Sequence, residues 1–353
     1  MEFGLSEEQI LLQDSVNRFL EAQAPLERVR QFAEDGDGDD IWAGLAQLGV
    51  AGLLSPEAAG GVGLSVFDAA LVAEALGYHT TPAAFIGSAV LAPIALTAAG
   101  HGDDPLLAEL AAGTTTAGLA FSEVNGARAD AGVTGDGNTL HGKALYVHDF
   151  ASEHYLVADA DQRLYLVAAH ARGLTSRILS TIDNTRVSGE LTFAATPARC
   201  LSSDPQLLER VIDIGRVMLA ADSLGAAQNM LEQAVAYAKQ REQFNRPIAS
   251  FQAVKHMCAE MAAELEPCRA MVWYAAHAAD HIPEELRVIA CQTKAHVSEV
   301  SKFVAKTATE VHGGMGFTDL LGLHYWFKRI GYNRQLLGAP ELIREQAAVA
   351  QGL

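Results

Sequence analysis

The sequence is poor in cysteine, in aromatic side chains and in basic charge, and these shortages exclude several classes of protein. The four cysteines, Cys200, Cys258, Cys268 and Cys291, are spaced neither as a disulfide framework nor as a Cys-x-x-Cys metal site. This predicts a reducing, cytoplasmic setting. Only 25 basic residues stand against 43 acidic ones, for a formal net charge of −18. Nucleic acid is therefore an unexpected partner, and an anionic ligand needs local cations or backbone N–H groups.

Long apolar runs are also missing. The longest uncharged stretch, residues 75–102, is interrupted by glycines and prolines, so it lacks the roughly 20 continuous apolar residues of a membrane-spanning helix. Residues 1–6 carry no basic region followed by an apolar stretch, so we expect no signal peptide. Because 50% of the residues are hydrophobic, a chain of 353 residues can bury a sizeable core. The sequence thus predicts a folded protein without a membrane span.

Hydrophobic periodicity divides the chain into three parts. Helical patterns cover about residues 6–20, where Ser6 precedes acids and Gln9 as a typical helix start, and about residues 40–49, 66–77 and 83–98. Short β-rich runs alternate with turns at about residues 117–122, 139–140, 144–147, 154–157, 164–168 and 190–193. Long helical patterns return at about residues 207–240, 249–279, 284–309 and 320–350.

The predicted fold class is α+β and mostly α. We expect an N-terminal helical domain over residues 1–114, a central β domain over 115–203 and a C-terminal four-helix bundle over 204–353. The short, turn-punctuated strands favour a small barrel or sandwich over parallel βαβ units.

Three motifs lie along this framework. They read Pro-Glu-Ala-Ala-Gly-Gly-Val-Gly-Leu from Pro56, Arg-Glu-Gln-Phe-Asn-Arg-Pro-Ile from Arg241 with Phe251 and Gln252 behind it, and Glu-Val-His-Gly-Gly-Met-Gly-Phe from Glu310. Alone, the glycines could simply end a helix, and Arg241 could complement a helix dipole. Together, a fork-shaped cation and a glycine turn with open N–H groups suit the pyrophosphate of a dinucleotide.

The motifs and their order resemble the acyl-CoA dehydrogenase family over essentially the whole chain. The resemblance implies FAD as cofactor, an acyl-CoA as substrate and an electron-transfer flavoprotein or similar acceptor as partner. It also implies that this chain contacts the ADP half of an FAD seated in a neighbouring subunit, through Arg241, Gln243, Phe244, Phe251, Gln252, Glu310, His312, Gly313 and Gly314. Glu310 replaces a family glutamine, and an ionised carboxylate only accepts hydrogen bonds.

The half of the family's site that holds the flavin ring is altered here. The family's Thr-Glu-Pro-x-x-Gly-Ser-Asp and Trp-Ile-Thr-Asn segments correspond to residues 121–130 and 146–149 of this sequence. Ser122 is the candidate replacement for the family's hydroxyl, while the Pro, the Gly-Ser and the Trp-Ile-Thr are lost. The resemblance therefore implies a weakened ring site.

The family's catalytic glutamate is missing as well. A positioned carboxylate is needed to remove the α-proton of an acyl-CoA. The two positions at which relatives carry it hold Leu337 and Gly215 here. Asp213 is two residues from Gly215 and, at about 100° per helical residue, faces the opposite side. The acids nearest the motifs are interpreted as surface or capping residues: Glu310, Asp319 and Glu341.

This pattern resembles the shorter, non-catalytic-type subunit of bacterial heterotetrameric acyl-CoA dehydrogenases, some of which act in steroid catabolism. The primary hypothesis is a subunit that completes the FAD site of a homologous catalytic partner, using apolar helix faces such as residues 220–236 as the interface. Two alternatives stay open: a self-sufficient homomeric dehydrogenase with a relocated base, and a non-catalytic regulator that binds acyl-CoA or flavin. No catalytic residue is assigned.

Two further clusters are given structural interpretations. His277 and His281 have i, i+4 spacing but lack the glutamate of a His-Glu-x-x-His motif, so no metal ligand is assigned. The aromatic run at residues 324–329 is interpreted as packed core, with adenine stacking or an interface as alternatives.

Overall fold

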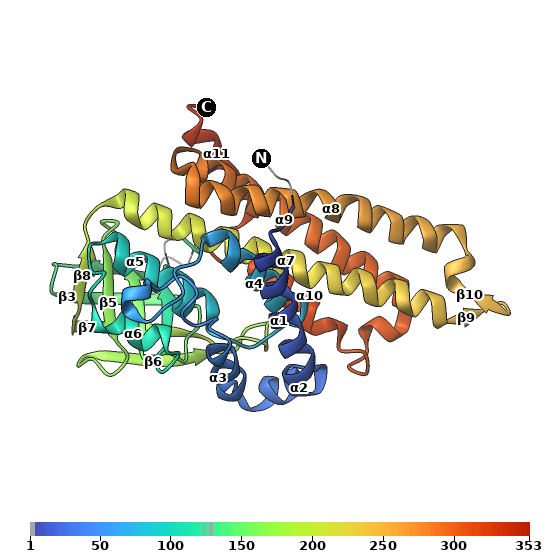
Figure 1. The fold of residues 1–353 in the computed structure, drawn as a ribbon, viewed down its shortest axis with the longest axis horizontal. Coiled ribbons are helices and arrows are strands. Elements are labelled where there is room, and N and C mark those ends of the chain that lie inside the picture. Colours follow the sequence, from blue (N-terminus) through green and yellow to red (C-terminus); the bar gives the residue numbers. More distant parts are fainter. Residues whose placement is uncertain (1–3, 123, 127–129) are drawn as a thin grey trace.

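A computed structural model describes residues 4–122, 124–126 and 130–353. Residues 1–3, which belong to the segment considered above for a signal peptide, therefore lie outside the described part of the chain. Helices are followed by strands and then by helices again (Figure 1), which confirms the mostly helical α+β class. Within the described ranges, no helix is both long enough and apolar enough to cross a membrane.

The first part of the chain is helical, as predicted. It contains α1 (Glu7–Gln23), α2 (Leu26–Asp35), α3 (Asp39–Gln47), the 3-10 turn η1 (Glu57–Ala59), α4 (Val66–Tyr78), the π-helix η2 (Ile86–Leu91), α5 (Ala92–Ala98) and α6 (Pro105–Ala111). Ser6 and Gln9 form the expected reciprocal cap of α1, with bonds of 3.0 and 3.2 Å. The pattern at 83–98 forms two elements, and Pro93, which cannot donate a backbone hydrogen bond, lies at their junction. The helical periodicity of the sequence did not lead us to predict α2 and α6.

The strands form two four-stranded sheets. One has the order β1 (Ala117–Ala120), β4 (His154–Ala158), β5 (Leu164–Ala168) and β8 (Arg199–Ser202). The other has the order β2 (Gly132–Gly135), β3 (Thr139–Val147), β7 (Ser188–Pro197) and β6 (Leu174–Leu179). Only β1 and β4 pair in parallel among these described strands. Both sheets bury side chains in one shared core, including Tyr165 of the first and Phe193 of the second, so of the two predicted forms, a small barrel or a sandwich, the structure has the sandwich.

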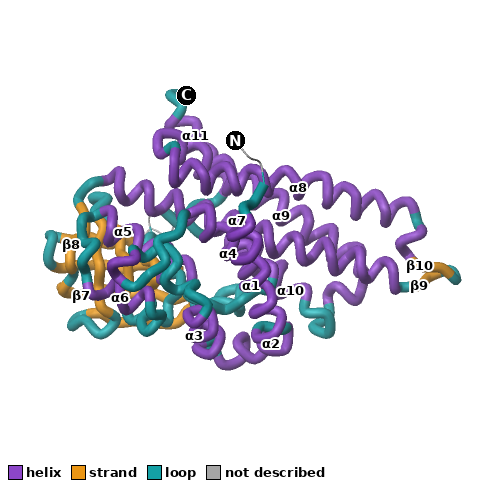
Figure 2. The backbone as a smooth tube through the Cα atoms, in the orientation of Figure 1, coloured by secondary structure: helices purple, strands orange, loops and turns teal. Residues whose placement is uncertain are grey.

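The last part of the chain is a bundle of long helices. It contains α7 (Pro205–Gln240), the small hairpin β9 (Glu242–Gln243) and β10 (Arg246–Pro247), η3 (Ile248–Ser250), α8 (Gln252–His281), α9 (Pro283–His312), η4 (Gly313–Phe317), α10 (Leu323–Gln335) and α11 (Pro340–Ala350). The single helix expected over 320–350 is wrong, because Leu337 and Gly338 have φ of 54° and 103° and Pro340 follows. Figure 2 shows the hairpin at the far end of the bundle, away from the sheets.

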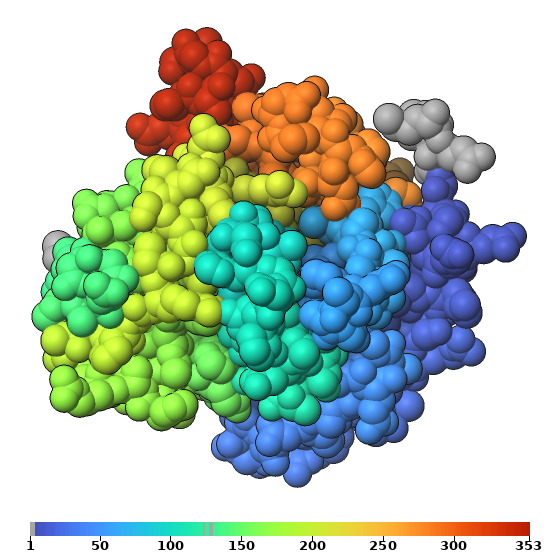
Figure 3. Space-filling model, turned by 60° about the vertical axis from the view of Figure 1, so that its left-hand side comes forward, coloured from blue at the N-terminus to red at the C-terminus, as the bar shows by residue number. Residues whose placement is uncertain are grey.

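Helix α7 lies at the centre of the molecule and packs against α4, α8, α9 and α10. The proposed interface at residues 220–236 is therefore wrong in its main part. Ala220, Ala221, Leu224 and Ala227 are at most 1% exposed because they already pack inside this chain. From the sheet end (Figure 3), the strands in green lie beside the N-terminal helices in blue and cyan, with the start of α7 in yellow between them.

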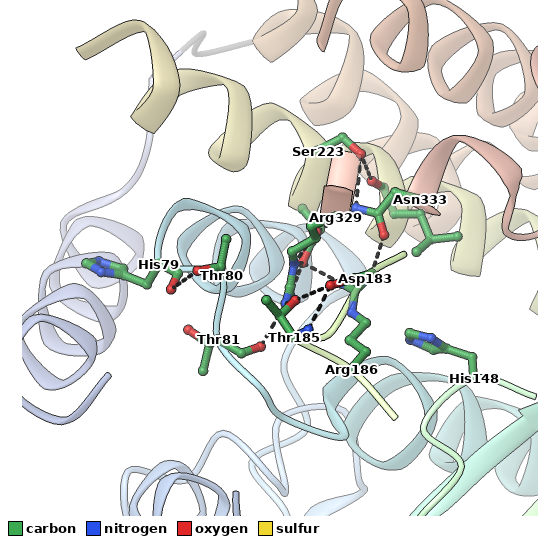
Figure 4. Close-up of polar contacts among 12 residues, drawn as sticks. His79, Thr80, Thr81, His148, Asp183, Thr185, Arg186, Ser223, Arg329 and Asn333 are labelled. Carbon is green, nitrogen blue, oxygen red and sulfur yellow. Dashed lines mark hydrogen bonds and ion pairs between the residues drawn. The ribbon is translucent and has the colours of Figure 1, made fainter. Parts of the chain in front are cut away.

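A buried ionic cluster joins all three parts of the chain (Figure 4). The Asp222 carboxylate on α7 accepts hydrogen bonds from Arg329 Nη2 at 2.6 Å and from Arg186 Nη2 at 2.7 Å. Arg329 also donates to Thr81 O and to Thr185 Oγ1, both at 3.0 Å. Although burial raises it, the two guanidinium groups hold the pKa of Asp222 well below its usual range. The cluster therefore contains a charged carboxylate that ties distant segments together.

The aromatic run before Arg329 is part of this core. Tyr325 and Trp326 are buried, and Trp326 Nε1 donates to Tyr78 O at 2.8 Å. Phe327 is 41% exposed on the other side of α10. The core interpretation of residues 324–329 is thus confirmed for the two buried rings.

Candidate functional site

The predicted ADP-binding residues lie at two turns at the far end of the bundle (Figure 1). The first turn follows α7, where the Arg241 N–H donates to Tyr237 O at 2.8 Å and the β9–β10 hairpin begins. The second is η4, which follows His312 at the end of α9. The rings of Tyr237 and His312 lie 4.6 Å apart between centroids. The two motifs, about 70 residues apart in sequence, are therefore neighbours through this ring contact.

Arg241 and the glycines leave their hydrogen-bonding groups open. Arg241 is exposed, and its guanidinium has no ion pair with another side chain in the described part of the protein. A Cβ added to Gly313 or Gly314 would meet nothing within 4 Å, and Gly313 has φ of 58°. An unused fork-shaped cation beside unobstructed backbone suits a pyrophosphate group. These residues fit the ADP half of FAD.

The hairpin presents aromatic surface next to Arg241. The Phe244 ring is 86% exposed and lies edge-on to Phe251, with 6.1 Å between centroids. The Arg246 guanidinium lies 4.1 Å from the centre of the Phe251 ring. Phe251 is thus covered by its own hairpin on one side, while Phe244 is free to contact a ligand or a partner.

Other predicted members are engaged within the chain or lie on the surface. Gln243 Nε2 donates to Glu242 O at 2.7 Å, and His312 Nδ1 lies 2.7 Å from Ala308 O. Burial lowers the pKa of His312, which favours the neutral ring. Gln252 is exposed at the start of α8. Glu310 is exposed, with Lys306 Nζ at 3.9 Å, as the surface interpretation expected.

Ser122 belongs to the sheet domain, and the sheets lie at the opposite end of the molecule from the β9–β10 hairpin (Figure 1). It follows β1, is 3% exposed, and its Oγ accepts the Leu145 N–H at 2.7 Å. Of the altered stretch 121–130, residues 123 and 127–129 lie outside the described part of the chain. A single chain therefore does not bring the predicted FAD residues together around one ligand.

The two family positions for the catalytic glutamate are in contact with each other. A Cβ added to Gly215 on α7 would lie 2.6 Å from Leu337 Cδ1 and 3.0 Å from Leu91 Cδ1. Leu337 is 5% exposed. The side chains of Leu337 and Leu91 therefore fill the space that an acid at position 215 would need.

The space beside Leu337 is almost closed. Its cavity volume is about 10 Å³, room for roughly one water molecule. It is lined by Ile86, Leu119, Phe121, Asn125, Tyr146, His148, Leu219, Leu336 and Leu337. An acyl chain does not fit there in this conformation.

A histidine that the sequence analysis did not single out lines this cavity. His148 is buried, its Nε2 lies 3.4 Å from Asp149 Oδ1, and its Nδ1 has no partner among the described residues. Burial lowers the pKa of His148, which keeps the ring neutral. A single histidine has no recognisable motif around it. The contact between His148 and Asp149 at this cavity could therefore be found only from the tertiary structure.

The loop that carries Leu337 is held by buried polar side chains. The Leu337 N–H donates to Asn125 Oδ1 at 2.8 Å, and the Leu337 carbonyl accepts from Arg216 Nε at 2.9 Å. Lys294 Nζ donates to Gly338 O at 3.4 Å. Asp213 pairs with Arg216, through an oxygen 2.9 Å from Nη1, so it is no free base. These contacts keep the loop in its closed position.

Comparisons with known proteins agree with the motifs. Residues 6–135 match the family model for the acyl-CoA dehydrogenase N-terminal domain, and residues 206–351 match that for the C-terminal domain. Acyl-CoA dehydrogenase IpdE2 of Mycolicibacterium smegmatis is 32% identical over 348 residues, which cover 97% of each chain. The chain belongs to the acyl-CoA dehydrogenase family.

Solved structures of this family extend the comparison. The steroid ACAD Tcur3481–Tcur3483 is 29% identical, with a TM-score of 0.89 over 98% of each chain. The ChsE4–ChsE5 complex from Mycobacterium tuberculosis gives a TM-score of 0.91 at 23% identity, over 100% of this chain and 99% of that one, which shows a common fold.

The remaining candidates from the sequence have structural roles. The His277 and His281 rings contact each other at a tilt of 49°, with centroids 4.5 Å apart. In the described part of this acyl-CoA dehydrogenase homologue, no three potential ligands are grouped for a metal ion. The side chains of Asp319 and Glu341 are 74% and 69% exposed, as the surface interpretation expected.

The contact between Gly215 and Leu337 gives a test of the closed site. We expect Gly215→Ala to lower the free energy of unfolding by about 1–3 kcal/mol, because the new methyl group overpacks against Leu337. In Gly215→Ala/Leu337→Ala the methyl group gains space, so the double variant loses less than the sum of the single losses. Urea unfolding of the four proteins measures this coupling, and strictly additive losses contradict the contact.

Buried Lys294 makes the stability depend on pH. Burial, with repulsion from Arg216 and Arg334, lowers the pKa of Lys294 to about 7, against about 10.4 in an unfolded chain. Between these values the unfolded chain binds more protons, so this group makes the free energy of unfolding rise with pH. We expect Lys294→Met to be more stable than the parent at pH 7 by about 1–4 kcal/mol, with the difference shrinking toward pH 10.

Chemical denaturation from pH 6 to pH 10 measures this difference. Lys302→Met is the matched control, because Lys302 lies on the same helix with its side chain 58% exposed. Lys302→Met should follow the parent across the range. If Lys294→Met and the parent run parallel at all pH values, Lys294 does not titrate as expected.

Proposed function

We propose that this chain is the FAD-completing, non-catalytic subunit of a hetero-oligomeric acyl-CoA dehydrogenase. One observation carries the proposal: the turns suited to the ADP half of FAD are open, while the acyl site of the same chain is closed. Arg241 is exposed and a Cβ on Gly313 would meet nothing within 4 Å, whereas Leu337 fills the space beside Gly215 and the cavity next to Leu337 measures only about 10 Å³. The chemistry that FAD supplies when bound is acceptance of a hydride from the acyl chain.

The open residues would act on the cofactor of a partner. Arg241 would pair with the pyrophosphate, and the backbone of Gly313 and Gly314 would approach it closely. Phe244, exposed beside them, would contact the same FAD or the partner's surface. The homologous partner would supply the carboxylate base and the ring pocket in a heterotetramer. This division places the two halves of one site on two unlike subunits.

The substrate class is proposed from the relatives. The steroid ACAD at 29% identity supports a bulky acyl-CoA, such as a steroid side-chain thioester. An electron-transfer flavoprotein or a similar carrier is the proposed acceptor. The free cysteines support a reducing, cytoplasmic location.

The test is purification of the chain alone and together with a homologous acyl-CoA dehydrogenase from its own organism. We expect the isolated chain to be colourless and inactive. We expect the co-purified complex to carry flavin absorbance and to oxidise a steroid side-chain acyl-CoA. If the isolated chain binds a full equivalent of flavin and forms enoyl-CoA, the proposal is wrong and a homomeric enzyme is indicated, with His148 as the base to test. If it binds acyl-CoA without a homologous partner, a regulator is indicated.

A further inference from the structure

The loop after the glycine turn is fastened by a helix from the opposite end of the sequence. Arg30 on α2 donates through Nη2 to Asp319 O at 2.5 Å and to Leu320 O at 3.1 Å. Helix α2 also packs directly on this loop, since a Cβ added to Gly322 would lie 2.7 Å from Leu26 Cδ1. In Figure 1, α2 lies below α10, which begins directly after the loop. We call residues 318–322 the clamp loop.

Besides Arg30, the clamp loop is held by Leu321, which is half-buried against the core, and by Leu323, which is buried directly after it. Leu320 and Phe317, in and beside the loop, are instead 74% and 82% exposed. They therefore contribute little burial that would fix the backbone. Hydrogen bonds from a guanidinium to carbonyl groups are charge-assisted and stronger than neutral ones. Arg30 is thus a main anchor of this segment.

The clamp loop continues without a break from the glycine turn. Both the N–H and the hydroxyl of Thr318 donate to Met315 O inside η4, at 3.1 and 2.8 Å. On the other side, η4 is pressed against α9, since a Cβ added to Gly316 would lie 2.7 Å from Thr309 O. A displacement of the clamp loop is therefore transmitted to Gly313 and Gly314 over a few tightly bonded residues.

The Arg30 side chain is held in position by an ion pair and by partial burial. Its side chain is 25% exposed, and Glu27 Oε2 lies 3.3 Å from Nη1, one turn earlier on α2. The neighbouring Arg28 points elsewhere and bonds Asp37 O and the Asp40 carboxylate, with Nη2 2.7 Å from Asp37 O. Two arginines of one helix thus have distinct partners, and only Arg30 of this pair contacts the clamp loop.

We propose that Arg30 is a positioning residue for the ADP half of FAD, acting through the clamp loop on the Gly313–Gly314 backbone. The inference rests on the proposed function, because it concerns how tightly the glycine turn holds FAD in the hetero-oligomer. Loss of Arg30 frees the turn to sample other conformations, so FAD leaves the complex faster. The loss of roughly one charge-assisted hydrogen bond corresponds to about a tenfold faster release.

The experiment uses the complete hetero-oligomer with FAD bound. The FAD release rate is followed by the rise in flavin fluorescence after dilution for Arg30→Ala, Arg30→Lys, Arg28→Ala and Arg241→Ala. We expect about tenfold faster release for Arg30→Ala, partial rescue by Arg30→Lys because an ammonium is a single point donor, and unchanged release for Arg28→Ala. The melting temperatures of the FAD-free complexes should fall equally for Arg30→Ala and Arg28→Ala.

The outcomes separate the inference from the proposed function. If Arg241→Ala accelerates release and Arg30→Ala does not, the positioning role is wrong and the proposed function stands. If Arg30→Ala and Arg28→Ala accelerate release equally, α2 matters only for folding and the inference is overturned. If Arg241→Ala also leaves release unchanged, the proposed function itself fails.

Discussion

Asp222→Ala is expected to lower the free energy of unfolding by about 3–5 kcal/mol, the usual cost of leaving a buried charge without its partner. The variant keeps Arg186 and Arg329 in the interior, where both now bond the Asp222 carboxylate. It also removes the acceptor of Asn333 Nδ2, which lies 2.6 Å from Asp222 Oδ1. Because the free energy of unfolding of a protein is only about 5–15 kcal/mol, this loss should remove a large part of the stability. Urea unfolding followed by circular dichroism measures the loss.

Two variants control for this result. Asp222→Asn keeps oxygen and shape but loses the charge, so an intermediate loss is expected. Asp40→Ala removes a carboxylate that pairs with Arg28 at the surface, where its side chain is 61% exposed, and should cost at most about 1 kcal/mol. A loss for Asp222→Ala as small as that for Asp40→Ala would show that the buried cluster is not ionic.

The effect of Asp222 has a defined pH window. Since its pKa is depressed in the folded protein, its stabilisation is complete above the ordinary aspartate pKa of about 3.9 and is lost as the pH falls through the lower folded value. The difference between the parent and Asp222→Ala should therefore stay constant across neutral pH and shrink only in strong acid.

Arg241→Ala is expected to weaken FAD binding by the hetero-oligomer by about 10- to 100-fold, the effect of losing hydrogen bonds from a charged group. The Arg241 guanidinium has no partner side chain in the described part of the chain, so its removal leaves no buried group unsatisfied. The change should therefore act on the ligand and not on the fold. Flavin absorbance after gel filtration, with titration of FAD into the stripped complex, measures the loss.

The matched control is Lys239→Ala, which removes an exposed cation from the last turn of the same helix. It should retain flavin like the parent. Arg241→Lys keeps the charge but not the planar fork, so its affinity should lie between the two. Retention of flavin by Arg241→Ala at the level of Lys239→Ala would remove Arg241 from the cofactor site.

Elements with strong local signals could be predicted from the sequence. The start of α1 at Ser6 and the long α7 depend on capping and periodicity, which are properties of neighbouring residues. The break between α10 and α11 was missed although Gly338 and Pro340 are sequence signals for a helix end. The φ of 54° at Leu337, by contrast, has no sign in the sequence. Helix α2 was missed although Leu26, Val29 and Phe32 recur at helical spacing, because the pattern is only ten residues long and no side chain caps its start.

The candidate site likewise has features that the sequence could predict and features that it could not. The sequence and its family resemblance were enough to predict that Leu337 and Gly215 stand where relatives carry the catalytic acid, and that Arg241 and Gly313 suit a pyrophosphate, because these predictions depend only on which residues are present. Tertiary structure alone decided that Gly215 and Leu337 touch, that Ser122 is buried in the sheet domain, and that Asp222 pairs with two distant arginines. These features depend on contacts between residues far apart in the sequence, and the local hydrophobic and polar pattern does not predict such contacts.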